Sequence, residues 1–445
     1  AGQAAIGIVK LSGPSAVEIV SRIYKPTNKK SLHKQASFSI SHGFVIDKKR
    51  NVIDEVLVSI MRGPKSYTAE DVVEINCHGG AIALQSVLGL ILENGARLAD
   101  PGEFTKRAYL NGRIDLAQAE AVADIVNAKT KLALKTAQGQ LSGKLSDSVK
   151  DIRRNLIEVL TQLQASIDFS DEDIQTEGYA LLTQKIDKAI KQCNKLLETF
   201  KDGQLLKQGI KTAIVGGPNV GKSSLLNALL NRERAIVTKA AGTTRDLIEE
   251  VINVKGLPLL LQDTAGIRKA FNEAEKKGIK LSQKALSDAD LVLMVFDISS
   301  GLGSIENQLV MDIKDKKTIA VLNKCDLKAM IKVADIKKIG IDNIVKVSAL
   351  TVEGIEDLKQ KITDICFEHH VEPKEVIVGN LRQAKAIEEG VKRMGKALSL
   401  LKEKESEEIV ALEIEGASES LARIIGEISN EDILNSIFST FCIGK

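Results

Sequence analysis

The chain has 445 residues, 44% of them hydrophobic, so it is too long for a single core and about two or three domains are expected. Its 62 basic and 59 acidic side chains leave a formal net charge of +3, which gives no case for polyanion binding by the chain as a whole and leaves a local basic patch open. Aromatic residues make up only 3% and tryptophan is absent, which argues against a nucleic-acid surface that stacks bases on aromatic rings.

The five cysteines are scattered, without the paired spacing of a zinc site or a disulfide framework, and this favours a reducing, cytoplasmic location. No apolar run approaches the roughly 18 residues that a membrane span requires. We therefore expect a soluble protein without membrane association. A strand-like run begins at residue 5, so the native start is expected to lie upstream of Ala1.

The first part of the chain mixes short β-rich runs with one helical run. Strands are predicted at 5–11, 52–60 and 72–75, and a helix is predicted at 81–94. Residues 1–112 are therefore predicted to form an α+β domain.

Two stretches of helical periodicity flank the middle of the chain, at 116–200 and from Pro373 nearly to the end. Their apolar residues recur at three- and four-residue spacing, as in Ile152, Leu156, Val159, Leu163 and Ile167, and in Leu421, Ile424, Ile425 and Ile428. We predict that 113–205 and 371–445 form one discontinuous helical domain in which the two apolar stripes are buried against each other.

Between the helical stretches, apolar strands alternate with helical segments. The strands are predicted at 211–215, 259–262, 291–296, 318–322 and 344–347. This alternation is typical of a mainly parallel sheet covered by helices. Residues 206–370 are therefore predicted to be an α/β domain inserted into the helical domain.

The first strand of the inserted domain leads into a phosphate-binding motif, Gly216-Gly217-Pro218-Asn219-Val220-Gly221-Lys222-Ser223, and a helical run follows it. The glycines allow backbone N–H groups to surround phosphate oxygens. Lys222 would reach the outer phosphates, and the Ser223 hydroxyl is placed to ligate Mg²⁺. This setting of strand, loop and helix predicts a nucleotide-binding site.

Four further motifs follow in the order typical of a guanine-nucleotide domain. Thr244, in Gly242-Thr243-Thr244-Arg245-Asp246, could complete the Mg²⁺ shell, and Asp263, in Asp263-Thr264-Ala265-Gly266, could hold the ion through water. Asp326, in Asn323-Lys324-Cys325-Asp326, can accept two guanine N–H donors that adenine does not present in that arrangement. Ser348-Ala349-Leu350 offers a backbone N–H to the guanine oxygen. Together the motifs predict a GTPase domain.

The group that orients the attacking water is not part of these motifs. In small Ras-like GTPases a glutamine directly after the DxxG motif has this role, but the chain has Ile267 there. The acidic residues Glu273 and Glu275 are the nearest candidates, and a solvated switch helix is the alternative interpretation of this segment.

Several runs outside these motifs resemble signatures of the MnmE (TrmE) family of bacterial tRNA-modification GTPases. They are TAEDVVEI at 68–75, His78-Gly79-Gly80, PGEFT at 101–105, DLAQAEA at 115–121 and FCIGK at 441–445. The resemblance covers almost the whole chain. It implies a multidomain α/β and α fold, with an N-terminal α+β folate-binding domain that dimerises, a discontinuous helical domain, and an inserted Ras-like P-loop G domain.

The resemblance also implies a GTPase that is activated by potassium-dependent dimerisation of its G domain. Asn219, Thr238, Ala240 and Thr243 would ligate a K⁺ ion that takes the place of an arginine finger. Ser223 and Thr244 would ligate Mg²⁺, and Glu275 would orient the attacking water. The expected GTP-binding residues are Asn219, Val220, Gly221, Lys222, Ser223, Ser224, Thr238, Lys239, Ala240, Ala241, Gly242, Thr243, Thr244, Asp263, Thr264, Ala265, Gly266, Asn323, Lys324, Asp326, Ser348 and Ala349.

By the same resemblance, a homodimer of the chain joins an FAD-binding MnmG-type partner in a hetero-oligomer. This assembly adds a carboxymethylaminomethyl-type group to carbon 5 of the wobble uridine of certain tRNAs. The one-carbon unit is expected from a 5-formyl- or methylene-type tetrahydrofolate, bound by Lys10, Glu74, Arg113 and Lys445. Lys10 stands where arginine is expected and Arg113 where lysine is expected, which keeps the charge but changes the hydrogen-bond geometry.

Two residues of the signature runs allow more than one interpretation. Cys442 is a candidate nucleophile or redox residue, with a packed, inert thiol as the alternative. His78 is interpreted as a turn residue or a wall of the folate pocket rather than a metal ligand. Two other functional classes also remain open: a GTPase that switches RNA affinity, such as a ribosome-assembly factor, and a helical self-assembling GTPase.

Overall fold

The computed structural model describes residues 4–28, 30–168, 178–230, 250–261, 286–313, 316–367, 376–442 and 444. The chain divides into two compact units. The first unit comprises Ala1–Ala123, Leu141–Val149 and Leu421–Lys445, and the second comprises Asp124–Gln140 and Lys150–Ser420. The two termini of the chain therefore belong to the same unit.

The first unit contains a five-stranded antiparallel sheet in the order β1-β5-β4-β3-β2. Its strands are β1 (Ile6–Ser12), β2 (Tyr24–Pro26), β3 (Ser39–Ile46), β4 (Val52–Met61) and β5 (Val72–His78). The three predicted strands are confirmed as β1, β4 and β5. Sequence reasoning missed β2, which is very short, and β3, where serine, histidine and glycine weaken the apolar alternation.

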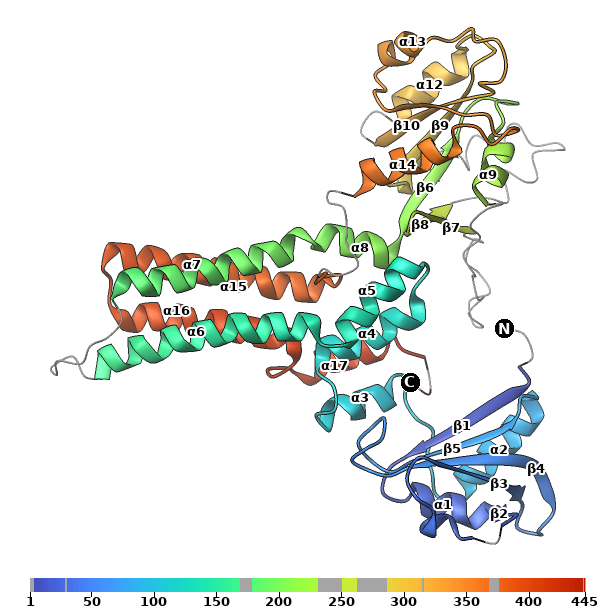
Figure 1. The fold of residues 1–445 in the computed structure, drawn as a ribbon, viewed down its shortest axis with the longest axis vertical. Helices are drawn as coiled ribbons and strands as arrows, with labels where there is room; N and C mark the ends of the chain where they lie inside the picture. Colours follow the sequence, from blue (N-terminus) through green and yellow to red (C-terminus); the bar gives the residue numbers. More distant parts are fainter. Residues whose placement is uncertain are drawn as a thin grey trace. The chain divides into compact units, whose positions relative to one another are not determined.

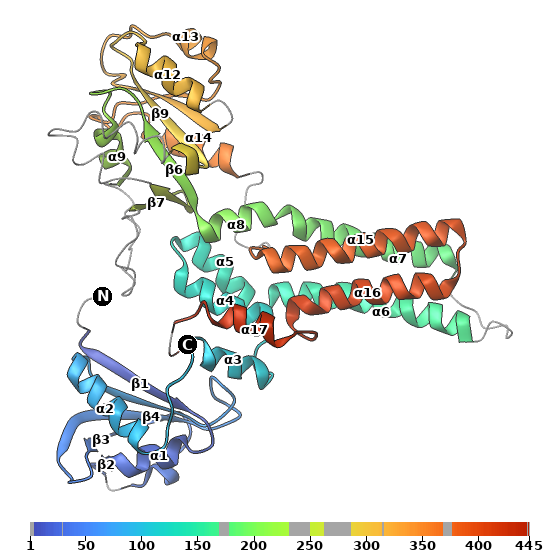
Figure 2. The ribbon, with the colours of Figure 1, turned by 180° about the vertical axis from the view of Figure 1, so that it is seen from behind.

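One face of this sheet is covered by α1 (Ala16–Ile23) and α2 (Ala81–Glu93), as Figures 1 and 2 show, with the short helix η1 (Leu32–Lys34) beside them. Val20, Val58 and Val87 are completely buried between the helices and the sheet. The opposite face leaves apolar side chains in solvent, with Ile8 54% exposed and Leu57 46% exposed. This alternation along the strands is typical of a sheet with one buried face.

The helical part of the first unit joins segments from both ends of the chain. It contains α3 (Glu103–Leu110), the first residues of α4 (Leu116–Asn127) and α17 (Glu431–Phe438). Leu116 and Phe438 share a small core, and the Tyr109 hydroxyl donates to the Gly426 carbonyl at 2.6 Å. The C-terminal segment is thereby fixed to α3 and α4.

The second unit contains a helical bundle. It contains α7 (Tyr179–Glu198), α8 (Phe200–Gln208) and α15 (Leu381–Glu403), and most of α5 (Lys131–Leu141), α6 (Lys144–Asp168) and α16 (Glu407–Ile425). Figures 1 and 2 both place α7 beside α15 and α6 beside α16, and the Arg153 guanidinium of α6 donates to the Ser418 carbonyl of α16 at 3.2 Å. Leu156, Ile186 and Met394 are completely buried in this bundle. Helices from the two distant helical stretches, α7 and α15, thus pack together in this unit, whereas Leu421, Ile424 and Ile425 belong to the first unit and Ile428 is 42% exposed, so the predicted pairing of the two apolar stripes stays a prediction.

The nucleotide domain is a six-stranded sheet in the order β11-β10-β9-β6-β8-β7. Its strands are β6 (Ile210–Val215), β7 (Glu250–Val254), β8 (Leu257–Leu261), β9 (Leu291–Asp297), β10 (Lys317–Asn323) and β11 (Ile344–Lys346). Every neighbouring pair is parallel except β7 with β8, so the predicted mainly parallel sheet is confirmed and β7 is the strand that the sequence did not predict.

Helices cover both faces of this sheet. They are α9 (Lys222–Leu230) and α14 (Ile355–Cys366) on one face, and α12 (Ser304–Asp312) and α13 (Val333–Lys338) on the other. The strands β6, β9 and β10 are buried along nearly their whole length, which explains why they read as continuous apolar runs.

A turn between β7 and β8 connects the nucleotide domain to the helical part of the second unit. The Thr130 hydroxyl, just before α5, donates to the Gly256 carbonyl at 2.7 Å. Gly256 has a φ of +95°, and a Cβ added there would lie 2.8 Å from a methyl group of Leu132. The turn thus needs glycine both for its backbone conformation and for the close approach of α5. Within the residues that the structure describes, no helix combines the length and apolar character needed to cross a membrane.

Candidate functional site

The loop between β6 and α9 has the geometry of a phosphate cradle. Gly216, with a φ of +150°, lies so close to β9 that a Cβ would clash with the Val295 carbonyl oxygen. Gly221, with a φ of +91°, lies equally close to the side chain of Asn323. Asn219 at the exposed tip also has a positive φ, of +60°, which asparagine tolerates better than most residues. The positive φ angles and the close approaches explain why the motif has glycine at 216 and 221. A loop with this backbone can surround a bound phosphate with its N–H groups.

The side chain of Lys222 binds the backbone of the loop. Its Nζ donates to the carbonyl oxygens of Gly216 and Gly217, at 3.0 and 2.6 Å. Burial lowers the pKa of Lys222, and the nearby Glu306 carboxylate partly opposes this shift. The α-helix begins at Lys222, and Ser223 in its first turn is exposed. Its side chain is therefore accessible from solvent at the start of the helix, as a Mg²⁺ ligand there would need to be.

The predicted guanine-binding residues gather at the carboxyl edge of the same sheet. Asn323 ends β10 and is 2% exposed. Its Nδ2 donates to the Val220 carbonyl at 2.8 Å, and its Oδ1 accepts the Ala349 N–H at 3.0 Å. One buried amide thereby joins the phosphate loop to the loop that carries Ser348 and Ala349. Asp326, three residues further on, is exposed and can accept hydrogen bonds from a base.

Several predicted site residues lie outside the described residues. They are Thr238, Lys239, Ala240, Ala241, Gly242, Thr243, Thr244, Asp263, Thr264, Ala265, Gly266, Glu275 and Lys445. The strands that flank these segments are described, and β8 ends at Leu261 beside β6. The predicted second Mg²⁺ ligand, most of the K⁺ ligands and the catalytic carboxylate stay predictions.

A second cluster of predicted residues lies in the first unit. Lys10 on β1 forms an ion pair with Glu74 on β5, with the Nζ and Oε1 atoms 3.2 Å apart. Lys10 also faces the rings of Tyr67 and Phe104, at 5.4 and 5.5 Å from the ring centroids. The Arg113 guanidinium lies 4.9 Å from the centroid of the Tyr67 ring. The structure therefore brings three of the four predicted folate contacts together around an aromatic ring.

Sequence reasoning gave no role to either ring of this cluster. Tyr67 directly precedes the 68–75 run, and its hydroxyl is 2.8 Å from the Thr105 hydroxyl of the 101–105 run. The 68–75 run and the 101–105 run are about 30 residues apart in the chain, and the fold brings them together at Tyr67. Both runs resemble signatures of the same family, and this was the signal in the sequence that could have indicated a contact between them.

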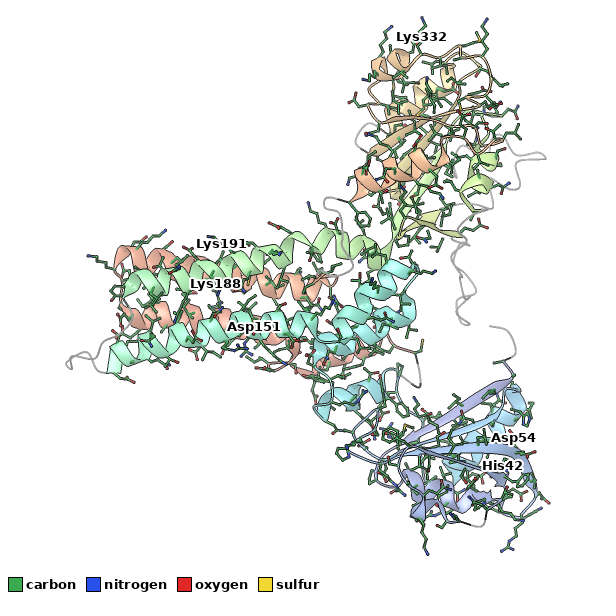
Figure 3. All side chains as sticks on the ribbon, viewed as in Figure 1. His42, Asp54, Asp151, Lys188, Lys191 and Lys332 are labelled. Carbon is green, nitrogen blue, oxygen red and sulfur yellow. The ribbon has the colours of Figure 1, made fainter. Side chains whose placement is uncertain are left out.

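His78 lies at the end of β5, four residues beyond Glu74, which is about 13 Å along a strand. Its Nδ1 is 2.6 Å from Oδ1 of Asp54, a side chain labelled in Figure 3, and its backbone N–H donates to Oδ2 of Asp54 at 2.8 Å. The hydrogen bond with Asp54 raises the pKa of His78. These bonds fix His78 at the strand end that precedes Gly79 and Gly80.

Cys442 is exposed, and its carbonyl accepts a hydrogen bond from the Gly102 N–H at 3.4 Å. Phe441 beside it packs against Phe438, with ring centroids 5.4 Å apart. The residue is therefore held by its backbone and its neighbour, with the thiol in solvent.

Comparisons with known proteins cover the whole chain. The family model described as the GTP-binding protein TrmE N-terminus matches residues 1–113, and that of the MnmE helical domain matches residues 116–442. The tRNA modification GTPase MnmE of Clostridioides difficile (strain 630) is 44% identical over 446 residues, which are 100% of this chain and 97% of that protein. The tRNA modification GTPase MnmE of Carboxydothermus hydrogenoformans is 43% identical over 449 residues, with the same two coverages.

Among solved structures, the G domain of the T. maritima FeoB iron transporter is 30% identical and covers 36% of this chain and 99% of its own. Its TM-score of 0.28 is too low to support an argument about the fold.

Proposed function

The chain belongs to the MnmE (TrmE) family of tRNA modification GTPases, and from this membership we propose that it hydrolyses GTP in the modification of tRNA. The structural observation that supports the nucleotide site in this proposal is the pair of hydrogen bonds made by Asn323. These bonds join the loop at 216–223, which is suited to phosphates, to the loop that carries Ser348 and Ala349, which is suited to a base. The side chain of Asn323 thereby fixes the distance between the two loops. In this site Lys222 and the loop N–H groups hold the phosphates, Ser223 ligates Mg²⁺, and Asp326 selects guanine.

The modification itself is proposed to occur at carbon 5 of the wobble uridine, together with an FAD-binding partner protein. A cytoplasmic location is proposed with it, because tRNAs take part in translation there. The test is mass spectrometry of tRNA nucleosides from cells that lack the protein, complemented with wild type or with Lys222→Ala. Loss of the wobble modification that only wild type restores supports the proposal. Unchanged wobble uridines, with the protein on assembling ribosomal particles, would instead identify a GTPase that switches RNA affinity.

Hydrolysis is proposed to depend on K⁺ and on dimerisation of the G domain. The exposed Asn219, in a left-handed backbone conformation at the loop tip, supports this because its side-chain oxygen is available to an ion. GTP turnover should be faster in KCl than in NaCl at equal ionic strength, and should rise with protein concentration. Equal slow rates in both salts would contradict the potassium mechanism.

Glu275 is proposed as the residue that orients the attacking water. Its neighbour Glu273 provides a matched control, because it carries the same charge two positions away. Glu275→Ala should lower turnover by about 100-fold or more while GTP still binds, whereas Glu273→Ala should keep turnover. The reverse result would move the role to Glu273.

The cluster around Tyr67 is proposed to bind a tetrahydrofolate derivative. Lys10 and Arg113 supply positive charge for its carboxylates, Glu74 can accept N–H donors of the pterin, and Tyr67 offers a ring for stacking. Calorimetric titration with 5-formyl-tetrahydrofolate should show binding that Lys10→Met weakens by about tenfold. Lys25→Met, at an exposed position of strand β2, is the control and should bind as wild type. Absence of binding to the wild type would reject this site.

A further inference from the structure

A carboxylate from the helix after β9 reaches the phosphate loop. Glu306 is the third residue of α12, and a Cβ added to Gly217 would lie only 2.5 Å from its Oε1 atom. Unlike Gly216 and Gly221, Gly217 has no positive φ, and its position in the motif is one of the variable ones. The lack of a side chain at Gly217 therefore leaves room for the carboxylate of Glu306 beside the loop.

The Glu306 carboxylate is held in this place by one of its oxygens. Oε2 accepts a hydrogen bond from the Gly303 N–H, the group that precedes α12, at 3.0 Å. Within the described part of the chain, Oε1 accepts no hydrogen bond and Glu306 forms no ion pair. The side chain is partly buried. A negative charge without a bound cation is thus fixed against the loop.

The charge of Glu306 acts on the lysine of the loop. The Nζ atom of Lys222 is bound to the carbonyl oxygens of Gly216 and Gly217. Burial lowers the pKa of Lys222, and the Glu306 carboxylate opposes this shift. The carboxylate is therefore near enough to influence the ammonium group that is proposed to contact the outer phosphates, although it does not pair with it.

Two effects of this charge on nucleotide binding can be compared. It could help to keep Lys222 protonated, or it could repel the phosphates that enter the loop. The ordinary pKa of lysine is 10.5, so a neutral Lys222 at pH 7 would require a shift of more than three units. A nucleoside diphosphate or triphosphate, by contrast, brings several negative charges to the loop at this pH, and like charges at short range repel. Repulsion is the larger effect.

We propose that Glu306 lowers the affinity of the site for guanine nucleotides by placing a negative charge beside the phosphate loop, which favours release of GDP after hydrolysis. The inference rests on the proposed GTP site and concerns how tightly that site holds its phosphates. Glu306 acts through its charge, so the hydrogen bonds of Lys222 and Asn323 to the backbone are not part of its effect.

The test measures the affinity of the full chain for a fluorescent GDP analogue. Glu306→Gln keeps an acceptor for the Gly303 N–H and nearly the same size, but it removes the charge. At about 50 mM KCl this variant should bind the analogue about three- to tenfold more tightly than wild type. The gain should shrink at about 500 mM KCl, because salt screens the repulsion. It should also be smaller for the matching GMP analogue, which carries fewer phosphate charges.

Two variants separate the charge from the cap of the helix. Asp335→Asn is the matched control, since Oδ2 of Asp335 accepts the Lys332 N–H at 3.1 Å at the start of α13, as Glu306 does at the start of α12. It should bind as wild type. Glu306→Ala removes both charge and cap, so it should lower the unfolding temperature and still bind GDP more tightly. Damage to the fold alone would weaken binding, so it cannot produce this gain.

The outcomes distinguish the inference from the site on which it rests. A wild-type chain that does not bind the GDP analogue would reject the proposed GTP site. If wild type binds and Glu306→Gln binds equally or more weakly, only the role of Glu306 is wrong. An equal gain for the GMP and GDP analogues, or the same gain in Asp335→Asn, would also contradict it, because the effect would then not depend on phosphate charge beside Glu306.

Discussion

Replacement of Asn323 by alanine is the most direct test of how the nucleotide site is assembled. The change removes the donor to the Val220 carbonyl and the acceptor of the Ala349 N–H, at 2.8 and 3.0 Å. Asn323 is 2% exposed, so water cannot readily take its place. Each buried partner left without a hydrogen bond costs about 1–3 kcal/mol, which gives about 2–4 kcal/mol for the pair after partial relaxation.

For a domain of this size that loss corresponds to a fall of roughly 5–15 °C in the unfolding temperature. The affinity for GDP should also fall, because the phosphate loop and the loop at 348–349 would no longer be fixed to each other. Thermal unfolding with and without GDP, together with titration of a fluorescent GDP analogue, measures both effects. Asn227→Ala, an exposed asparagine in α9, is the matched control and should change stability by at most about 0.5 kcal/mol.

A second variant separates the two hydrogen bonds. Asn323→Asp keeps the acceptor for Ala349 but places a buried carboxylate oxygen against the Val220 carbonyl, so it should be at least as destabilised as the alanine variant. The reasoning is refuted if Asn323→Ala keeps both its unfolding temperature and its GDP affinity within twofold of wild type.

Two further predictions concern other parts of the chain. Hydrogen bonds, above all from Arg97, lower the pKa of Glu103 from 4.5 to about 2 despite its burial, so the stabilisation that its charge provides is complete above pH 4.5 and is lost as the pH falls toward 2. The stability difference between wild type and Glu103→Gln should therefore shrink on acidification, and a constant difference in pH-dependent thermal unfolding would contradict this. Gly256→Ala should destabilise the second unit by about 1–3 kcal/mol, because its φ is +95° and the new Cβ would meet Leu132. Gly301→Ala, with open space around it, is the control, and equal unfolding temperatures of the two variants would show that α5 moves aside.

The sequence predicted the phosphate loop well because every part of that motif is local. A buried strand, glycines and the start of a helix follow one another within about twenty residues, and each obeys backbone rules that hold without the rest of the fold. The alternation of strands and helices likewise indicated a parallel sheet, since buried strands show continuous apolar runs. The antiparallel strand β7 was missed because its short run, Glu250–Val254, starts with a charge and lacks a clear apolar pattern.

Residues that meet across the fold could not be paired from the sequence. Tyr67 and Arg113 are 46 positions apart, Asp297 and Lys324 are 27 apart, and the segment after Leu421 joins the first unit although it follows the whole second unit. Spacing along the chain carries no information on such contacts, because sheet order and helix packing decide them.

The sequence by itself therefore determined the family to which the chain belongs, and it predicted the nucleotide site and the order of the domains. Only the tertiary structure decided that Asn323 joins the phosphate and base loops, that Lys324 is bound by Asp297, and that Tyr67 lies among the predicted folate contacts. The physical reason is that backbone conformation and burial leave periodic patterns in the chain. A hydrogen bond or ring contact between distant residues forms only when packing brings them within a few ångströms.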